Sequence, residues 1–183
     1  NKFIKIFKNK KKGLGSAINI GIRKSRSEYL CIFMCDLSDD TNDIIKYFKI
    51  IKKDKNLHAV FGTRFSKFSK VENYPFFKLI LNRLANNLIK IITLTDYNDF
   101  TNAFKIYKKE TLNKLMPLVS ENFNIFLELP LKIISRKYKY KIIPINWKGR
   151  TTGISKFKIK EIGSMYIFTL CYCLLEKILL NKK

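Results

Sequence analysis

The feature that most constrains the fold is the apolar run at residues 29–35, which an acidic segment follows at once. Such a run is typical of a strand buried on both faces of a parallel sheet. Four of the fourteen acidic residues then lie within eight positions: Asp36, Asp39, Asp40 and Asp43. In open α/β sheets, ligands bind just beyond the carboxyl ends of the strands. We therefore expect a divalent cation and a phosphorylated ligand at this point.

Strand patterns alternate with helical patterns along the rest of the chain. We predict strands at residues 59–62, 103–107 and 140–145, and helices after the acidic segment, from residue 74 and from residue 111. A further helix carries Leu127 and Leu131, and we expect Pro130 to interrupt it. This order predicts an α/β domain with a mostly parallel sheet flanked by helices, over residues 1–161.

The segment 162–183 is predicted to form a C-terminal apolar or amphipathic helix. Residues 162–175 carry no charge, but this stretch is shorter than the ~20 residues that span a bilayer. We expect either a helix buried against the domain or one lying in a membrane interface.

The net charge of +23 depends mainly on lysine, which outnumbers arginine 31 to 6. The bias indicates a drift in composition more than a dedicated nucleic-acid surface. A basic surface would still attract anionic lipid headgroups and phosphorylated ligands. A basic nucleic-acid-binding module stays open as an alternative, although no recognisable module is present.

The four cysteines show no zinc-type spacing. We expect all four to be buried reduced thiols, which fits a cytoplasmic protein.

Polar residues adjoin the predicted strands. Arg64 follows the strand 59–62, Asp99 precedes the strand 103–107, and Arg150 and Lys156 follow the strand 140–145. Gathered with Asp36 at one sheet edge, they would combine carboxylates for a cation with cations for phosphate.

Two further local patterns bear on this site. Gly13 and Gly15 precede a helix and allow close backbone approach to a ligand. Asp40 and Asp43 are more readily explained as caps of the next helix than as ligands.

The ordered set of motifs resembles the family 2 glycosyltransferases, of the kind that includes dolichyl-phosphate mannosyltransferase and polyprenyl-phosphate sugar transferases. The matching segments span about residues 12–170 and occur in the family's order, and the closing R-x-x-G-x-S-K is the most specific. They are residues 13–17, 36–40, 62–65, 82–83, 99–105, 128–132 and 150–156.

The resemblance implies a GT-A (Rossmann-like) fold, a nucleoside-diphosphate sugar donor and inversion, on the cytoplasmic face of a membrane. Asp36 matches the last acid of the D-x-D motif, which holds Mg²⁺ or Mn²⁺ and the donor diphosphate. Arg150, Lys156 and Gly15 match residues of the family's donor-binding site.

The resemblance also assigns the acceptor side of the site. Arg64 and Arg83 match groups near an acceptor phosphate, and the acceptor would be a polyprenyl or dolichyl phosphate. Asp99 matches an acid near the sugar, as a positioning group or a base. Asp99 and Arg64 are thus the candidate catalytic residues.

Two departures from the family pattern stand out. Met34 occupies the position of the first D-x-D acid, and the usual N-terminal strand is absent, so we expect the sheet to lack its first strand. A non-catalytic fragment or degenerate relative therefore stays open as a second alternative.

Overall fold

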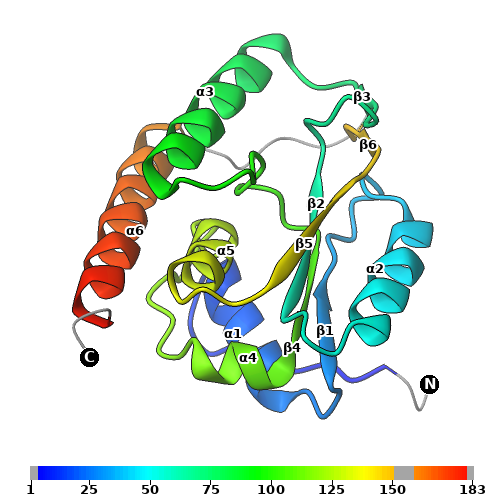
Figure 1. Ribbon diagram of the computed structural model, residues 1–183, viewed down its shortest axis with the longest axis vertical. Coiled ribbons are helices and arrows are strands. Elements are labelled where there is room, and N and C mark those ends of the chain that lie inside the picture. The colour runs from blue at the N-terminus through cyan, green and yellow to red at the C-terminus, as the bar shows by residue number, and fades with distance from the viewer. Residues whose placement is uncertain (1–3, 151–158, 181–183) are drawn as a thin grey trace.

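The computed structural model describes residues 4–150 and 159–180, in which helices alternate with strands (Figure 1). The helices are α1 (Leu14–Lys24), α2 (Thr41–Lys53), α3 (Phe76–Thr93), α4 (Lys109–Lys114), α5 (Ile125–Ser135) and α6 (Ile159–Leu180). The strands are β1 (Tyr29–Ile32), β2 (Ala59–Thr63), β3 (Val71–Glu72), β4 (Lys105–Lys108), β5 (Tyr140–Pro144) and β6 (Trp147–Lys148). The predicted α/β class is confirmed.

Four strands form the main sheet in the order β1-β4-β2-β5. β2 pairs with β5 in parallel, from Ala59 opposite Tyr140 to Thr63 opposite Pro144. β4 runs antiparallel to both β1 and β2, so the sheet is mixed. β1, β2 and β5 nevertheless share one direction, and their carboxyl ends meet at the same edge. A second, small sheet joins β3 to β6 in parallel.

Side chains of β2 alternate between two apolar cores, as the pleat of a strand requires. Ala59 and Phe61 belong to the core on the side of α1, α4 and α5, whereas Val60 packs with Tyr47 and Ile51 of α2. Figure 1 shows α2 on one side of the sheet and α5 on the other. Helices thus cover both faces, and the sheet edge is left for the site.

α5 is apolar nearly all round and lies between the sheet and α6, with residues 125–133 all buried. The helix continues through Pro130, so the predicted interruption is wrong. Proline removes one backbone hydrogen bond. Here the burial of Leu127, Leu129 and Leu131 on either side of it outweighs that loss.

Glu128 of α5 anchors the loop before this helix. Its carboxylate accepts the backbone N–H groups of Val119 at 2.9 Å and Ser120 at 2.8 Å, and pairs with Lys132 at 3.1 Å. Both charged side chains are buried. The loop therefore stays in place beneath the start of α1.

α6 packs on α5 through buried Thr169 and Cys173, and exposes Ile167, Phe168 and Leu179. The stretch Gly163–Leu180 is long and apolar enough to cross a membrane by length and composition, with mean hydropathy 1.4, and 11% of it is buried. The expectation of a buried helix is therefore wrong. The interfacial helix and the boundary at residue 162 stay predictions.

Only one of the four cysteines is buried as expected. Cys173 is buried and Cys31 half-buried, but Cys35 and Cys171 are exposed. Cys35 is exposed because β1 ends at Ile32, three residues before it, and Cys171 lies on the outer side of α6.

Candidate active site

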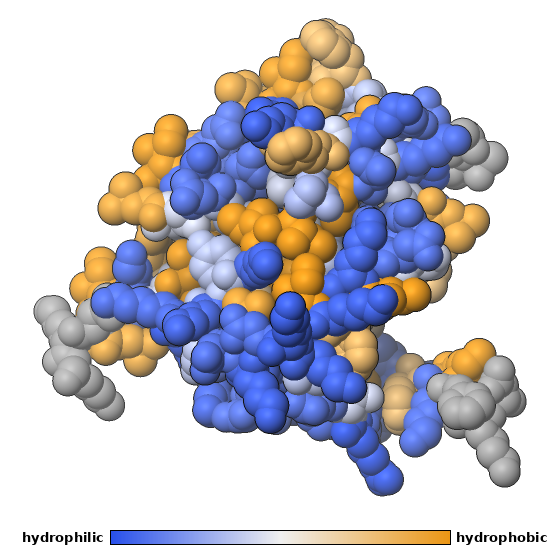
Figure 2. Space-filling view, turned by 45° about the vertical axis from the view of Figure 1, so that its right-hand side comes forward, coloured by the Kyte–Doolittle hydropathy of each residue, from blue (hydrophilic) through white to orange (hydrophobic). Residues whose placement is uncertain are grey.

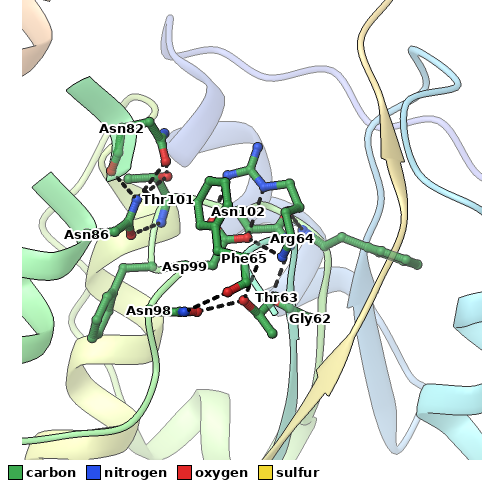
Figure 3. Close-up of polar contacts among 12 residues, drawn as sticks. Gly62, Thr63, Arg64, Phe65, Asn82, Asn86, Asn98, Asp99, Thr101 and Asn102 are labelled. Atoms are coloured by element: carbon green, nitrogen blue, oxygen red, sulfur yellow. Dashed lines mark hydrogen bonds and ion pairs between the residues drawn. The ribbon is translucent and has the colours of Figure 1, made fainter. Parts of the chain in front are cut away.

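Arg64 and Asp99 form a buried ion pair just beyond the carboxyl end of β2 (Figure 3). Asp99 Oδ2 accepts the backbone N–H of Arg64 at 2.8 Å and its Nε–H at 2.9 Å, and Oδ1 accepts from Nη2 at 2.7 Å. Asp99 is 0% exposed and Arg64 is 8% exposed. Two parallel bonds between guanidinium and carboxylate fix the plane of both groups. The pair therefore holds Arg64 in one orientation.

Asp99 also keeps Arg64 charged. Burial acts to lower the pKa of Arg64, but the charge and hydrogen bonds of Asp99 outweigh it and raise that pKa. Because Arg64 engages both oxygens of Asp99, the carboxylate orients the arginine in this structure. A general base would instead have to reach a substrate proton. A role for Asp99 as a base stays a prediction.

Aromatic rings surround the Arg64 guanidinium. Its Cζ lies 5.2 Å from the ring centroid of Phe65, 5.5 Å from that of Trp147 and 5.8 Å from that of Tyr74. The Cζ of Arg83, carried by α3, lies 4.7 Å from the same Phe65 ring. Arg64 and Arg83, which come from different elements, thus meet at one aromatic ring.

The loop between α3 and β4 is tied to the end of β2. Asn102 Nδ2 donates to the carbonyl of Gly62 at 3.2 Å. The hydroxyl of Tyr97 donates to the carbonyls of Gly62 at 3.1 Å and Asp99 at 2.6 Å. These bonds place Asp99 against Arg64.

α3 is tied to the same loop (Figure 3). Asn82 Nδ2 donates to Thr101 Oγ1 at 2.9 Å, and Asn86 Oδ1 accepts the backbone N–H of Thr101 at 3.3 Å. Asn86 Nδ2 donates to Asn82 Oδ1 at 2.8 Å. Since Arg83 lies between these residues on the helix, the network also sets its position.

Lys105 is a buried lysine beneath this loop. Its Nζ donates to the carbonyls of Phe100, at 3.0 Å, and Asn102. Burial lowers the pKa of Lys105 to about 7, against the opposing charge of Asp99, and the charge of Arg64 adds to the lowering. Lys105 therefore holds the loop that carries Asp99.

In the acidic loop, the half-buried Asp36 shapes a turn. Its Oδ1 accepts the backbone N–H of Ser38 at 3.2 Å, across Leu37, which has a left-handed φ of 59°. Asp39 is 8% exposed, and burial raises its pKa to about 6, with Arg64 opposing and Asp36 adding to the rise. The two carboxylates are therefore close enough to influence each other.

The other two acids lie at the start of α2, where the capping role predicted for Asp40 is confirmed and Asp43 makes an ion pair instead of a cap. Asp40 is the N-cap, and its side chain accepts the backbone N–H of Asn42 at 2.8 Å. Asp43 lies in the first turn and pairs with Lys46 at 2.6 Å.

A cavity of about 250 Å³ lies between the acidic loop, β3 and β6. The backbone N–H of Lys148 donates to the carbonyl of Ser38 at 3.0 Å, and Asp39 forms a β-bridge with Trp147. β6 leads through Gly149 to Arg150, so the acidic loop lies beside the start of the predicted donor loop. The lining residues are Leu37, Ser38, Asp39, Asp40, Lys70, Glu72, Asn146, Trp147 and Lys148.

Comparison with known proteins identifies the family. Residues 1–116 match the family model described as Glycosyl transferase family 2. The chain belongs to glycosyl transferase family 2.

Two curated relatives of this family 2 protein are a mannosyltransferase and a monophosphomannose synthase by name. The chain is 28% identical over 162 residues to dolichol-phosphate mannosyltransferase of Pyrococcus furiosus, covering 86% of the chain and 44% of the relative. It is 25% identical over 122 residues to polyprenol monophosphomannose synthase of Mycolicibacterium smegmatis, covering 60% and 46%. The chain thus spans about half the length of each relative.

Solved structures confirm the GT-A fold. Glucosyl-3-phosphoglycerate synthase from Mycobacterium tuberculosis, in complex with UDP, has a TM-score of 0.62 at 12% identity, covering 89% of the chain and 55% of that protein. Its complex with Mn²⁺, UDP-glucose and phosphoglyceric acid has a TM-score of 0.60 at 13% identity, with the same coverage.

In this family 2 domain, the structure brings several predicted site residues together. Arg64 and Arg83 meet at the Phe65 ring, and Asp99 pairs with Arg64. Asp36 lies in the loop beside β6. Arg150 is exposed at the end of the described segment, and Lys156 lies outside the described residues. The roles of all these residues stay predictions.

Gly15 has a packing explanation. A Cβ at this position would lie far inside contact distance of the Ser120 carbonyl oxygen and the backbone of Glu121. The glycine therefore allows close approach of another chain segment, and a ligand contact is not needed to explain it.

The sequence placed Asp39 in the acidic segment without a ligand role of its own, and it did not assign Lys105 to the site. The available signal for Lys105 was a lysine within the otherwise apolar segment 103–107, three residues beyond Asn102. The burial of Asp39 has no local signal, because it depends on the distant strand β6.

The described residues contain no group of three or more His, Cys, Asp or Glu side chains that could hold a metal ion. Mg²⁺ is commonly held by one or two carboxylates together with substrate phosphates. Asp36 and Asp39 fit that pattern.

Proposed function

We propose that this protein transfers a sugar from a nucleoside-diphosphate sugar to a polyprenyl or dolichyl phosphate, with inversion at the anomeric carbon. One observation supports this most: the acidic loop lies beside β6, which leads to Arg150, while Trp147 of β6 contacts the buried Arg64. Groups for a diphosphate and groups for a second phosphate therefore lie next to each other.

On the donor side, Asp36 lies near the diphosphate, and Arg150 and Lys156 bind its oxygens. A divalent cation, when bound, neutralises charge on the departing diphosphate. Arginine offers paired donors for phosphate, and lysine a single charge.

On the acceptor side, Arg64 and Arg83 orient the lipid phosphate. That phosphate is already an anion at neutral pH, so positioning by cations matters more than a strong base. Its oxygen attacks the anomeric carbon and forms the new C–O bond. The bond from that carbon to the diphosphate breaks, and the nucleoside diphosphate leaves with the electron pair.

Apolar surface suited to a lipid acceptor lies on the helix that carries Arg83. α3 exposes Phe76, Phe77, Leu84 and Leu88. Figure 2 shows hydrophilic residues over most of the lower part of the face drawn, and apolar residues along its left and upper margins. With the net charge of +23, this supports binding to the cytoplasmic face of an anionic membrane.

The test is release of nucleoside diphosphate by the full-length protein, with Mn²⁺, a panel of sugar nucleotides and polyprenyl phosphate. We expect release that needs both a donor and the lipid phosphate. Arg83→Ala should raise KM for the lipid phosphate, while Lys90→Ala on the same helix should not. No release with any donor would favour a non-catalytic relative.

A further inference from the structure

Two neighbouring buried oxygens in the acidic loop make no hydrogen bond with the described residues: Ser38 Oγ and Asp39 Oδ1. Ser38 is 6% exposed and Asp39 is 8% exposed, and both line the cavity beside β6. Buried polar atoms without partners are rare in native proteins, and a buried carboxylate oxygen is among the most costly. A ligand in this cavity that binds oxygen would remove that cost.

The chemistry of these atoms favours a cation. Asp36 lies in the same loop, three residues before Asp39, and its charge acts on Asp39. The carboxylates that line the cavity belong to Asp39, Asp40 and Glu72, and a hard divalent cation prefers carboxylate and hydroxyl oxygens. Two lysines also line the cavity, Lys70 and Lys148, and Lys70 already pairs with Glu72 at 3.1 Å.

We propose that Asp39 is the second carboxylate ligand of a divalent cation, which Asp36 and a diphosphate group also bind, with Ser38 Oγ beside it. The inference rests on the proposed function, because the diphosphate comes from the donor. It also accounts for the departure at Met34. The family pattern has a carboxylate at the position of Met34, and we propose that Asp39 supplies this carboxylate instead.

The test is calorimetric titration of the full-length protein with an equimolar mixture of Mn²⁺ and inorganic pyrophosphate, which needs no knowledge of the nucleotide. We expect wild type to bind. Asp39→Asn should bind at least about tenfold more weakly, because the cation loses a ligand. Ser38→Ala should weaken binding by a smaller factor. Asp54→Asn is the matched control, because this exposed acid lies at the C-terminal end of α2 and does not line the cavity.

Thermal unfolding guards against a folding defect. Without Mn²⁺, Asp39→Asn should be at least as stable as wild type, because it removes a buried charge whose Oδ1 lacks a partner. With Mn²⁺ and pyrophosphate, the midpoint should rise for wild type and Asp54→Asn, and much less for Asp39→Asn.

Equal binding by Asp39→Asn and wild type would overturn the inference, and so would an absence of binding by wild type. If Asp36→Asn loses binding while Asp39→Asn keeps it, the inference fails and the donor site stands. If Asp39→Asn loses binding but no donor supports release of nucleoside diphosphate, the inference stands and the proposed function fails.

Discussion

At the scale of residues, the site depends on charges that are buried and mutually oriented. Asp99 engages Arg64 through three hydrogen bonds. Removing one partner of such a pair leaves the other buried and uncompensated, which costs more than the pair contributes when intact. This asymmetry makes the pair easy to test.

Asp99→Asn should lower the free energy of unfolding by about 3–5 kcal/mol, because the Arg64 guanidinium then lacks its counter-charge. Urea unfolding of the purified protein measures the change. Asp96→Asn alters an exposed acid three residues away and should leave the midpoint in place. Equal midpoints for the two variants would show that the pair is not buried as described.

Lys105 predicts a dependence of stability on pH. Because burial lowers its pKa from 10.5 to about 7, the unfolded chain binds more protons than the folded chain between those values. The free energy of unfolding should therefore rise as the pH rises through that window. The rise is about 1.4 kcal/mol for each unit by which the pKa differs between the folded and the unfolded chain. Asp99, Arg64 and Asp39 also influence this titration.

The measurement is the unfolding midpoint of wild type and Lys105→Met from pH 6 to pH 10. The rise assigned to Lys105 should disappear in the variant. Lys108→Met, which changes a half-buried lysine at the end of the same strand, is the control. An equal rise in Lys105→Met would assign it to other groups.

Sequence patterns predicted the role of a residue where its partner lies nearby in the sequence. The capping role of Asp40 needs only the N–H of Asn42, two residues away. The Arg64–Asp99 pair joins residues 35 positions apart. That contact follows from the tertiary path of the chain, so the sequence indicated the two residues but not their pairing.

At the scale of helices and strands, tertiary packing explains two features that local sequence preferences do not. α5 tolerates Pro130 because the residues on both sides of this proline are buried, and α1 has a glycine, Gly15, at its second residue because another segment approaches closely there. Neither outcome could be predicted from helix propensity. Helix propensity predicts a break at proline, and it gives no reason for a glycine at position 15.

Two glycines of α1 give a matched test. Gly15→Ala should destabilise the protein by about 1–3 kcal/mol, because the new Cβ would overlap the backbone at Ser120. Gly21→Ala meets nothing within 4 Å and should stabilise the helix by about 0.5–1 kcal/mol. Chemical denaturation of both variants measures the two changes. A neutral Gly15→Ala would contradict the packing explanation.

At the scale of the whole molecule, two kinds of surface coexist. α3 and α6 expose apolar side chains, while the chain as a whole carries a charge of +23. The alternation of patterns was enough to predict the α/β class. It could not predict the strand order β1-β4-β2-β5, because the antiparallel insertion of β4 depends on contacts distant in sequence.

The surfaces predict binding to anionic vesicles. Co-sedimentation with phosphatidylglycerol vesicles should be strong at low salt and weaker as salt rises. Leu84→Glu with Leu88→Glu on α3 should reduce it, because these exposed side chains would enter the interface. Ile45→Glu, on exposed α2 surface, is the control. Equal losses for both would point to a general charge effect.

The acceptor that we propose is a phosphate anion held by Arg64 and Arg83. Its most direct test gives the full-length protein a radiolabelled sugar nucleotide with either polyprenyl phosphate or the matching polyprenol. We predict labelled lipid from the phosphate and none from the alcohol, at neutral pH. Equal labelling of the two lipids, or labelling of the alcohol alone, would contradict the claim.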